Sequence, residues 1–152
     1  MFIKEMSRHE CSSVIQAGRL ARLACCNEGR PYVVPITYAF TGNCIYCFSM
    51  PGQKIDWMRA NPHVCLQVDE FSGERQWKSV LVFGRYQELP PEGRWQRECV
   101  HAWSLLEARP NWWEPGGLKP APQAIAGSSP HVFFCVDIED MTGRAAHEGG
   151  EA

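Results

Sequence analysis

Hydrophobic and polar residues alternate with a period of two in six stretches of the chain, and this pattern predicts six β-strands. The centre of the fifth stretch is apolar on both faces, which is typical of a strand in the middle of a sheet. Gly84 within it predicts a β-bulge or the close approach of another backbone. The polar segment Phe71–Gln76 before it is expected to be a loop. The predicted strands are Arg19–Cys26, Tyr32–Phe40, Cys44–Ser49, His63–Asp69, Trp77–Leu89 and His131–Met141.

Apolar residues at helical spacing predict three short helices between the strands. The first begins at a capping box in which Glu10 follows Ser7 by three residues. The second begins after Gly52, and the third has Pro91 at its first position. Because the connections are short, the strands are expected to be mostly antiparallel. Six strands with few helices indicate a mainly β protein and favour a small closed barrel.

Pro35 interrupts the second predicted strand. A proline lacks the N–H group that a sheet ladder needs, so it belongs on an edge or beside a gap where no neighbouring strand pairs. Such a gap leaves backbone groups free to contact a ligand. An ordinary edge strand explains the proline equally well, so the strand pattern leaves both interpretations open.

The turn after the third predicted strand has the features of a phosphate site. Met50-Pro51-Gly52 leads into a helix that carries Gln53 and Lys54 in its first turn. A lysine there opposes the helix dipole, but a bound anion makes it favourable. Free N–H groups, the Ser49 hydroxyl and the Lys54 ammonium would then converge on that anion. A solvent-exposed lysine is the alternative, and the spacing does not match the Walker sequence.

Composition places the chain among ordinary globular proteins. Its 152 residues suit one domain, with 45% hydrophobic and 21% charged residues and a net charge of -2. The basic residues are scattered, which excludes the footprint of a nucleic-acid binder. No apolar run reaches membrane-spanning length and the first residues lack the core of a signal peptide, so we expect a cytoplasmic protein. We expect the domain to cover residues 1–144 and residues 145–152 to be a disordered tail.

Eight cysteines raise the question of a disulfide or zinc framework. Most of them lie in predicted strands among apolar neighbours, where a thiol acts as a small hydrophobic group. Cys44 and Cys47 form a C-x-x-C pair, but an odd separation on a strand points them to opposite faces. Because no second pair completes a zinc site, we expect no metal centre.

A long segment rich in proline, glycine and serine, Asn111–Pro130, carries Trp112 and Trp113. Long ordered loops in compact domains are commonly lids or binding loops. Two adjacent tryptophans are expected to pack against the barrel, a partner subunit or a flat ligand.

An ordered set of segments resembles the pyridoxamine 5′-phosphate oxidase-like flavoproteins, in particular the branch related to nitroimidazole-resistance proteins. The likeness extends from Gly18 to about Arg144 and implies a six-stranded split β-barrel, a homodimer, and FMN in clefts at the dimer interface. The segments that carry it are GRLARLAC, GRPYVVPITYAF, CIYCFSMPGQKIDWMRANPHVCLQVDE, WKSVLVFGRYQEL and WWEPGG.

The resemblance also implies which residues hold the flavin. The first flavin strand falls on Tyr32–Thr37, whose backbone would face the ring, and the end of the next strand would flank the ring and ribityl chain. Gln53 and Lys54 fall on the phosphate-binding pair, and Ser79 falls where the family offers a polar side chain. The cofactor residues implied are Val34, Pro35, Ile36, Thr37, Cys47, Phe48, Ser49, Gln53, Lys54 and Ser79.

At two positions the sequence differs from related family members, and each difference argues against one specific activity. Nitroimidazole-resistance relatives typically carry a histidine where this chain has Phe48, so nitroimidazole reduction is not implied. Thr37 replaces the strand-end lysine of the true pyridoxamine phosphate oxidases, which argues against vitamin B6 synthesis.

We therefore expect an oxidoreductase that moves electrons between a nicotinamide donor and a small organic acceptor. Tyr38, Trp112 and Trp113 are the candidates for the substrate side, and no side chain stands out as an acid or base. The alternatives are a non-catalytic protein that holds flavin or haem in the same cleft, and a deazaflavin-dependent reductase.

Overall fold

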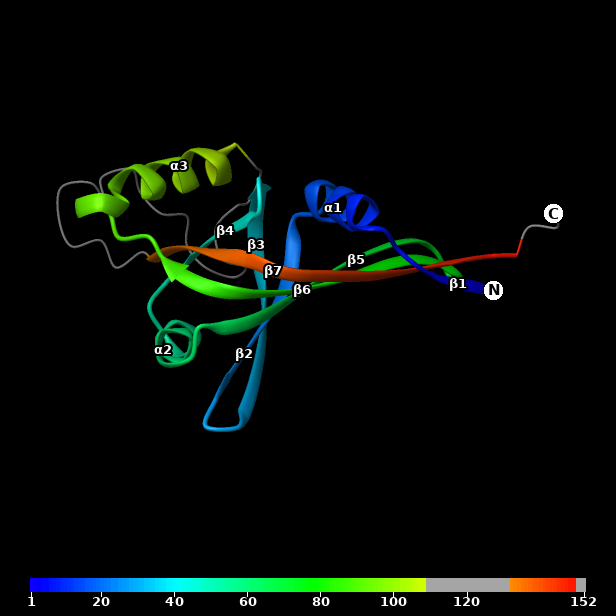
Figure 1. The fold of residues 1–152 in the computed structure, drawn as a ribbon, viewed down its shortest axis with the longest axis horizontal. Helices are drawn as coiled ribbons and strands as arrows, with labels where there is room; N and C mark the ends of the chain where they lie inside the picture. The colour runs from blue at the N-terminus through cyan, green and yellow to red at the C-terminus, as the bar shows by residue number, and fades with distance from the viewer. Residues whose placement is uncertain (109–131, 150–152) are drawn as a thin grey trace.

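The computed structural model describes residues 1–108 and 132–149 (Figure 1). Its described elements are strands β1 (Phe2–Glu5), β2 (Leu20–Asn27), β3 (Arg30–Thr41), β4 (Cys44–Ser49), β5 (His63–Gly73), β6 (Gln76–Glu88) and β7 (Val132–His147), helices α1 (Arg8–Ala17), α2 (Gln53–Ala60) and α3 (Gln96–Glu107), and a 3₁₀ turn, Gly93–Trp95. Within these residues, no helix combines the length and apolar character needed to cross a membrane.

The strands close into an antiparallel barrel, as the alternating sequence predicts. The order along the sheet is β1-β7-β4-β3-β2-β5-β6, and an additional pairing of β6 with β7 closes the ring. Six strands, β2 to β7, therefore form the barrel, and the short β1 extends the free edge of β7 near its end. The pairing of β6 with β7 covers the edges that these two strands would expose in an open sheet.

The barrel is split between β3 and β4. β3 pairs with β2 along Arg30–Thr37, whereas its ladder with β4 joins Tyr38–Thr41 to Cys44–Cys47. The two strands separate where the chain runs from Tyr38 back towards Pro35. The gap lies beside the proline, as one of the two interpretations of the sequence predicts.

Two apolar layers follow from the alternation along the strands. Ile45 and Cys47 of β4 point into the barrel, while Tyr46 and Phe48 point to the opposite face. α3 covers that second face through side chains such as Leu106. In Figure 1, α3 lies over β4 and the first part of β7, and α2 lies on the opposite side of β6 from α3.

The element boundaries differ from the sequence-based expectation in four places. The Phe71–Gln76 segment extends the β5–β6 hairpin, and β1 is an additional strand. β7 continues to His147 and pairs with β6 and β1, so the expectation of a disordered tail from residue 145 is wrong for residues 145–147. The third helix begins at Gln96 after a 3₁₀ turn rather than at Pro91. β1 and the end of β5 have exposed side chains on both faces. The sequence there lacks the alternation of apolar and polar residues that predicts a strand.

Candidate functional site

The edge of β3 at the split carries the first group of predicted cofactor residues. Pro35 is exposed, Val34 and Thr37 are half-buried, and the Ile36 side chain is buried in the barrel. Pro35 is opposite Arg22 of β2 in the ladder. The last ladder pair between β3 and β4 joins Tyr38 to Cys47. β4 therefore does not continue alongside Val34–Ile36, and this edge of β3 is available to a ligand.

The start of α2 provides the corner next to this edge. Gly52 is the N-cap residue, and no side chain caps the helix within the described part of the chain. A Cβ atom built on Gly52 would meet nothing within 4 Å, so the turn faces open space. Amide groups at an uncapped helix start suit an anion. The corner therefore fits a phosphate group, as the Gln53–Lys54 pattern predicts.

Lys54, in the first turn of α2, is close enough to β2 and β4 to act electrostatically on a thiol of each strand. It is half-buried, and its positive charge opposes the effect of burial, which raises the pKa of the Cys25 and Cys47 thiols. Cys25 belongs to β2 and Cys47 to β4, the two neighbours of β3. The ammonium group is thus held near the barrel end at which β3 and β4 separate, beside the open turn at Gly52.

The end of β4 contributes buried side chains. Cys47 and Ser49 are completely buried, and Phe48 is 1% exposed and packs against Phe133, with ring centroids 5.3 Å apart. The Ser49 hydroxyl donates a hydrogen bond of 2.8 Å to the carbonyl oxygen of Met50. In this conformation the segment offers a ligand its backbone, and the Ser49 hydroxyl is directed to the protein itself.

A hydrogen-bonded chain on the outer face of the barrel connects Ser79 to the β3 edge. Gln67 of β5 donates to the Ser79 hydroxyl at 3.0 Å, and Arg22 of β2 donates to the Gln67 side-chain oxygen at 3.3 Å. Asp69 accepts from both Arg22 and Gln67. The network spans three adjacent strands, β2, β5 and β6, and it borders β3 because Arg22 is the ladder partner of Pro35.

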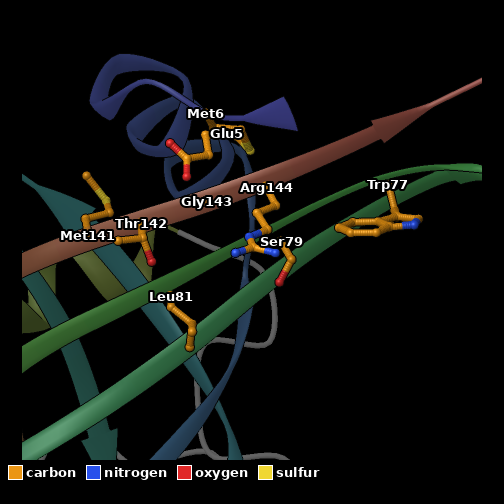
Figure 2. Close-up of a pocket in the computed structure, with 9 residues that line it drawn as sticks. All are labelled: Glu5, Met6, Trp77, Ser79, Leu81, Met141, Thr142, Gly143 and Arg144. Atoms are coloured by element: carbon orange, nitrogen blue, oxygen red, sulfur yellow. The ribbon is translucent and has the colours of Figure 1, made fainter. Parts of the chain in front are cut away.

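A groove of ≈ 490 Å³ lies beside Ser79. Figure 2 shows the residues that line it. Trp77, Ser79 and Leu81 of β6 form one wall, and Arg144 of β7 extends toward Ser79. Of the predicted cofactor residues, Ser79 lines the groove, while the β3 edge and the α2 corner lie elsewhere on the barrel. The structure thus places the predicted residues in two regions, and the Arg22–Gln67–Ser79 network leads from the groove to the strand next to the β3 edge.

The proposed substrate-side residues are placed differently. Tyr38 is 1% exposed inside the barrel, and its hydroxyl donates a hydrogen bond of 2.6 Å to the Ile15 carbonyl oxygen. It therefore has no surface to offer a substrate, and we withdraw it from the substrate side. Trp112 and Trp113 lie outside the described residues.

Burial makes several thiols near the site poor nucleophiles. Burial, followed by a hydrogen bond to Asp137, raises the pKa of Cys44 to about 11. Burial also raises the pKa of Cys135, to about 12, and that of Cys47 further. A thiol must lose its proton to act as a nucleophile, so these three groups are unsuited to covalent catalysis at neutral pH.

Sequence reasoning missed Arg22, Gln67, Asp69, Trp77 and Arg144. Gln67 and Asp69 lie on the polar face of an alternating strand, which was a usable indication of a polar outer surface. Their connection to Arg22 depends on the pairing of β2 with β5, which local patterning does not specify.

Comparisons with known proteins agree with this architecture. The family model described as pyridoxamine 5′-phosphate oxidase matches residues 7–145. An uncharacterised protein of Rhizobium meliloti (strain 1021), RA0666, is 66% identical over 149 residues, which cover 98% of this chain and 99% of that protein.

Two crystal structures share the fold. An FAD-binding protein from Mesorhizobium loti is 49% identical, with a TM-score of 0.81 and coverage of 97% of this chain and 100% of that one. A candidate 5-nitroimidazole antibiotic resistance protein from Bacteroides thetaiotaomicron is 19% identical, with a TM-score of 0.70 and coverage of 95% and 89%. The match over nearly the whole chain shows that this protein belongs to the pyridoxamine 5′-phosphate oxidase family of split β-barrels.

Proposed function

We propose that this protein binds a flavin and acts as an oxidoreductase between a nicotinamide donor and a small organic acceptor. The observation that carries the proposal is the corner where the β3–β4 split meets the uncapped start of α2. The end of β4 leads through the turn at Gly52 into α2, which has Lys54 in its first turn, and Trp57 of α2 packs against Tyr32 of β3. A flavin nucleotide has a flat ring and a phosphate, and these are the two parts that such a corner suits.

In this proposal Lys54 and the first amides of α2 hold the phosphate, because a charge-assisted contact and the helix dipole both favour an anion. The β3 backbone around Val34, Pro35 and Ile36 lies along the ring. Ser79 lies in the separate groove on the outer face and is connected through Gln67 to Arg22, the ladder partner of Pro35. The flavin itself supplies the redox chemistry when bound, and the protein binds, orients and shields it.

We further propose that the flavin is FMN rather than FAD. The family resemblance implies FMN, and a single phosphate seat at Lys54 suits a mononucleotide. The Mesorhizobium loti relative, at 49% identity, is described as FAD-binding. Heat denaturation releases a non-covalent flavin, and chromatography of the supernatant distinguishes FMN from FAD. We expect FMN.

We also propose that the protein is a homodimer that shares its outer barrel face. Phe83, Cys65, Ala24 and Val33 are successive ladder partners across β6, β5, β2 and β3, and they form an apolar row. Phe83 is 46% exposed and Val33 62% exposed. A row of exposed apolar side chains beside the Arg22–Gln67–Ser79 network has the mixed character of a subunit interface.

A visible spectrum followed by anaerobic titration tests the function. The purified protein should show flavin absorption that bleaches when NADH or NADPH is added without oxygen. A flavin that neither donor reduces would support a binding protein without this activity. A Soret band would instead assign the cleft to haem, and reconstitution with a deazaflavin but not FMN would support the deazaflavin reductase.

A further inference from the structure

Three metal-ligating side chains meet on the face of the sheet that α3 partly covers. Cys44 of β4 is the ladder partner of Asp137 of β7, and Cys135 lies two residues earlier on the same face of β7. One ligand atom from each of these residues lies within 4.8 Å of the other two. The Cys44 thiol donates a hydrogen bond to Oδ1 of Asp137 at 3.2 Å.

The three side chains extend from a fixed backbone, and solvent reaches one side of the cluster. Cys135 is 6% exposed, Cys44 is half-buried and Asp137 is exposed. Next to Cys44, Asn43 Nδ2 donates to the Ile138 carbonyl oxygen at 2.7 Å, and the Ile138 amide donates to the Asn43 carbonyl oxygen at 3.0 Å. These two bonds fix the turn before β4 against the inner part of β7, so the ligand side chains extend from a rigid backbone.

We propose that Cys44, Cys135 and Asp137 bind a thiophilic divalent cation, specifically Zn²⁺, with a water molecule as the fourth ligand. Two sulfurs and one carboxylate oxygen are ligands that Zn²⁺ accepts in tetrahedral geometry, whereas Mg²⁺ and Ca²⁺ require oxygen ligands. Both thiols release their protons to solvent when the metal binds. The exposed side of Asp137 leaves room for the water.

The geometry requires a small adjustment of side chains. Two sulfurs bound to one tetrahedral zinc lie about 3.8 Å apart, given a Zn–S distance of about 2.3 Å. The present spacing of up to 4.8 Å is therefore somewhat open. Rotation of the half-buried Cys44 and the exposed Asp137 about χ1 can close it, while the strand backbones stay in place.

Charged groups from two other elements border the site. Two thiolates and one carboxylate carry three negative charges, of which Zn²⁺ neutralises two. Arg85 of β6 is the other ladder partner of Asp137 and brings one positive charge to its border. Glu98 of α3 is close enough to act electrostatically on both thiols, and it adds to the attraction for a cation.

The C-x-x-C spacing does not identify this site. Cys47 points into the barrel, on the other face of β4 from Cys44. The partners of Cys44 come from the last strand, and Asp137 is 93 positions away in the sequence. Spacing along the sequence compares Cys44 with Cys47 and does not bring Cys44 together with Cys135 and Asp137.

The test measures zinc binding by the full-length chain, with any bound flavin retained. The protein is reduced, stripped with a chelator, incubated with Zn²⁺ and desalted, and its metal content is determined by mass spectrometry. Affinity is obtained by competition with a chromophoric chelator, and X-ray absorption at the zinc edge reports the ligands. We expect one zinc per chain with two sulfur ligands at about 2.3 Å.

Asp137→Asn and Cys135→Ala should each weaken zinc binding by at least about tenfold, since even the loss of an outer-sphere partner has an effect of this size. Cys26→Ser, which alters a half-buried free cysteine of β2, is the matched control and should leave the affinity unchanged. Asp137 is exposed, so its variant is expected to fold even if Cys135→Ala does not. Zinc without sulfur ligands, equal affinity in Asp137→Asn, or no retained zinc would each overturn the proposal.

Discussion

The Tyr38 hydroxyl donates a hydrogen bond of 2.6 Å to the carbonyl oxygen of Ile15 and so connects β3 to the last turn of α1. Both residues are buried. Tyr38→Phe should lower the free energy of unfolding by about 1–3 kcal/mol, because it leaves a buried carbonyl group without this donor. Urea denaturation measures the loss.

Tyr32→Phe is the matched control for this change. Tyr32 is half-buried and packs its ring against Trp57, with centroids 5.5 Å apart. Its variant should shift stability by less than about 0.5 kcal/mol. A Tyr38→Phe protein with unchanged stability, but an altered KM for a reducible substrate, would contradict the interior role and restore Tyr38 to the substrate side.

Lys54→Ala should weaken flavin binding by about 1–3 kcal/mol, if the ammonium makes a charge-assisted contact with the phosphate. The change is measured by fluorescence titration of the apoprotein. Arg75→Ala removes one positive charge from the exposed β5–β6 turn and should leave the dissociation constant unchanged. Equal affinities of the Lys54 variant and the wild type would remove Lys54 from the site.

Phe83→Lys should raise the dimer dissociation constant by at least about tenfold, or ~1.4 kcal/mol, because it replaces the largest apolar side chain of the row with a charge. Sedimentation at several protein concentrations measures the dissociation constant. Val100→Lys is the control, since Val100 is 63% exposed on α3, away from that row. If the cofactor is shared between subunits, dilution should release flavin from the Phe83 variant first. Undisturbed dimers in this variant would place the interface elsewhere.

The nucleophilic reactivity of Cys44 should depend steeply on pH. Burial and the Asp137 contact raise its pKa to about 11, so roughly one molecule in a thousand carries the thiolate at pH 8. Alkylation by iodoacetamide should therefore accelerate about tenfold per pH unit between pH 7 and 10. Asp137→Asn removes the negative charge, lowers the pKa and should speed alkylation at pH 8. Peptide mapping measures these rates, and a wild-type profile that levels off below pH 9 would refute the assignment.

Gly84→Ala should lower stability by about 1–3 kcal/mol, because the new Cβ would lie 2.5 Å from the Asp137 carbonyl oxygen. The register between β6 and β7 shifts at this glycine, as the predicted bulge requires. Gly73→Ala is the control, since the nearest atom to its Cβ is 4.0 Å away. Thermal unfolding compares the two variants. Equal midpoints would show that β6 and β7 can move apart without loss of stability.

Local rules predicted the elements that bury a regular face or use a specific cap. The Ser7 hydroxyl accepts a hydrogen bond from the Glu10 amide at 3.1 Å, as a capping box requires. The opposite orientations of Cys44 and Cys47 follow from the strand period alone. The missing N–H group of Pro35 predicted either a gap in the sheet or an edge strand. The structure shows the gap.

Features that depend on which strands pair could not be predicted from the sequence. Arg22, Gln67 and Ser79 form one network because β2, β5 and β6 are adjacent, and this adjacency is set by the closure of the barrel. The extension of β7 to His147 likewise depends on its pairing with β6 and β1. In each case the partner residues are distant in sequence and carry no local pattern that connects them.

A crystal structure of the protein grown with excess FMN tests the central claim most directly. The account predicts that the phosphate lies against Lys54 and the first amides of α2, with the ring along the backbone of Val34, Pro35 and Ile36. Density for the cofactor in another place, such as the groove between Trp77 and Arg144, together with an empty corner at Gly52, would contradict it.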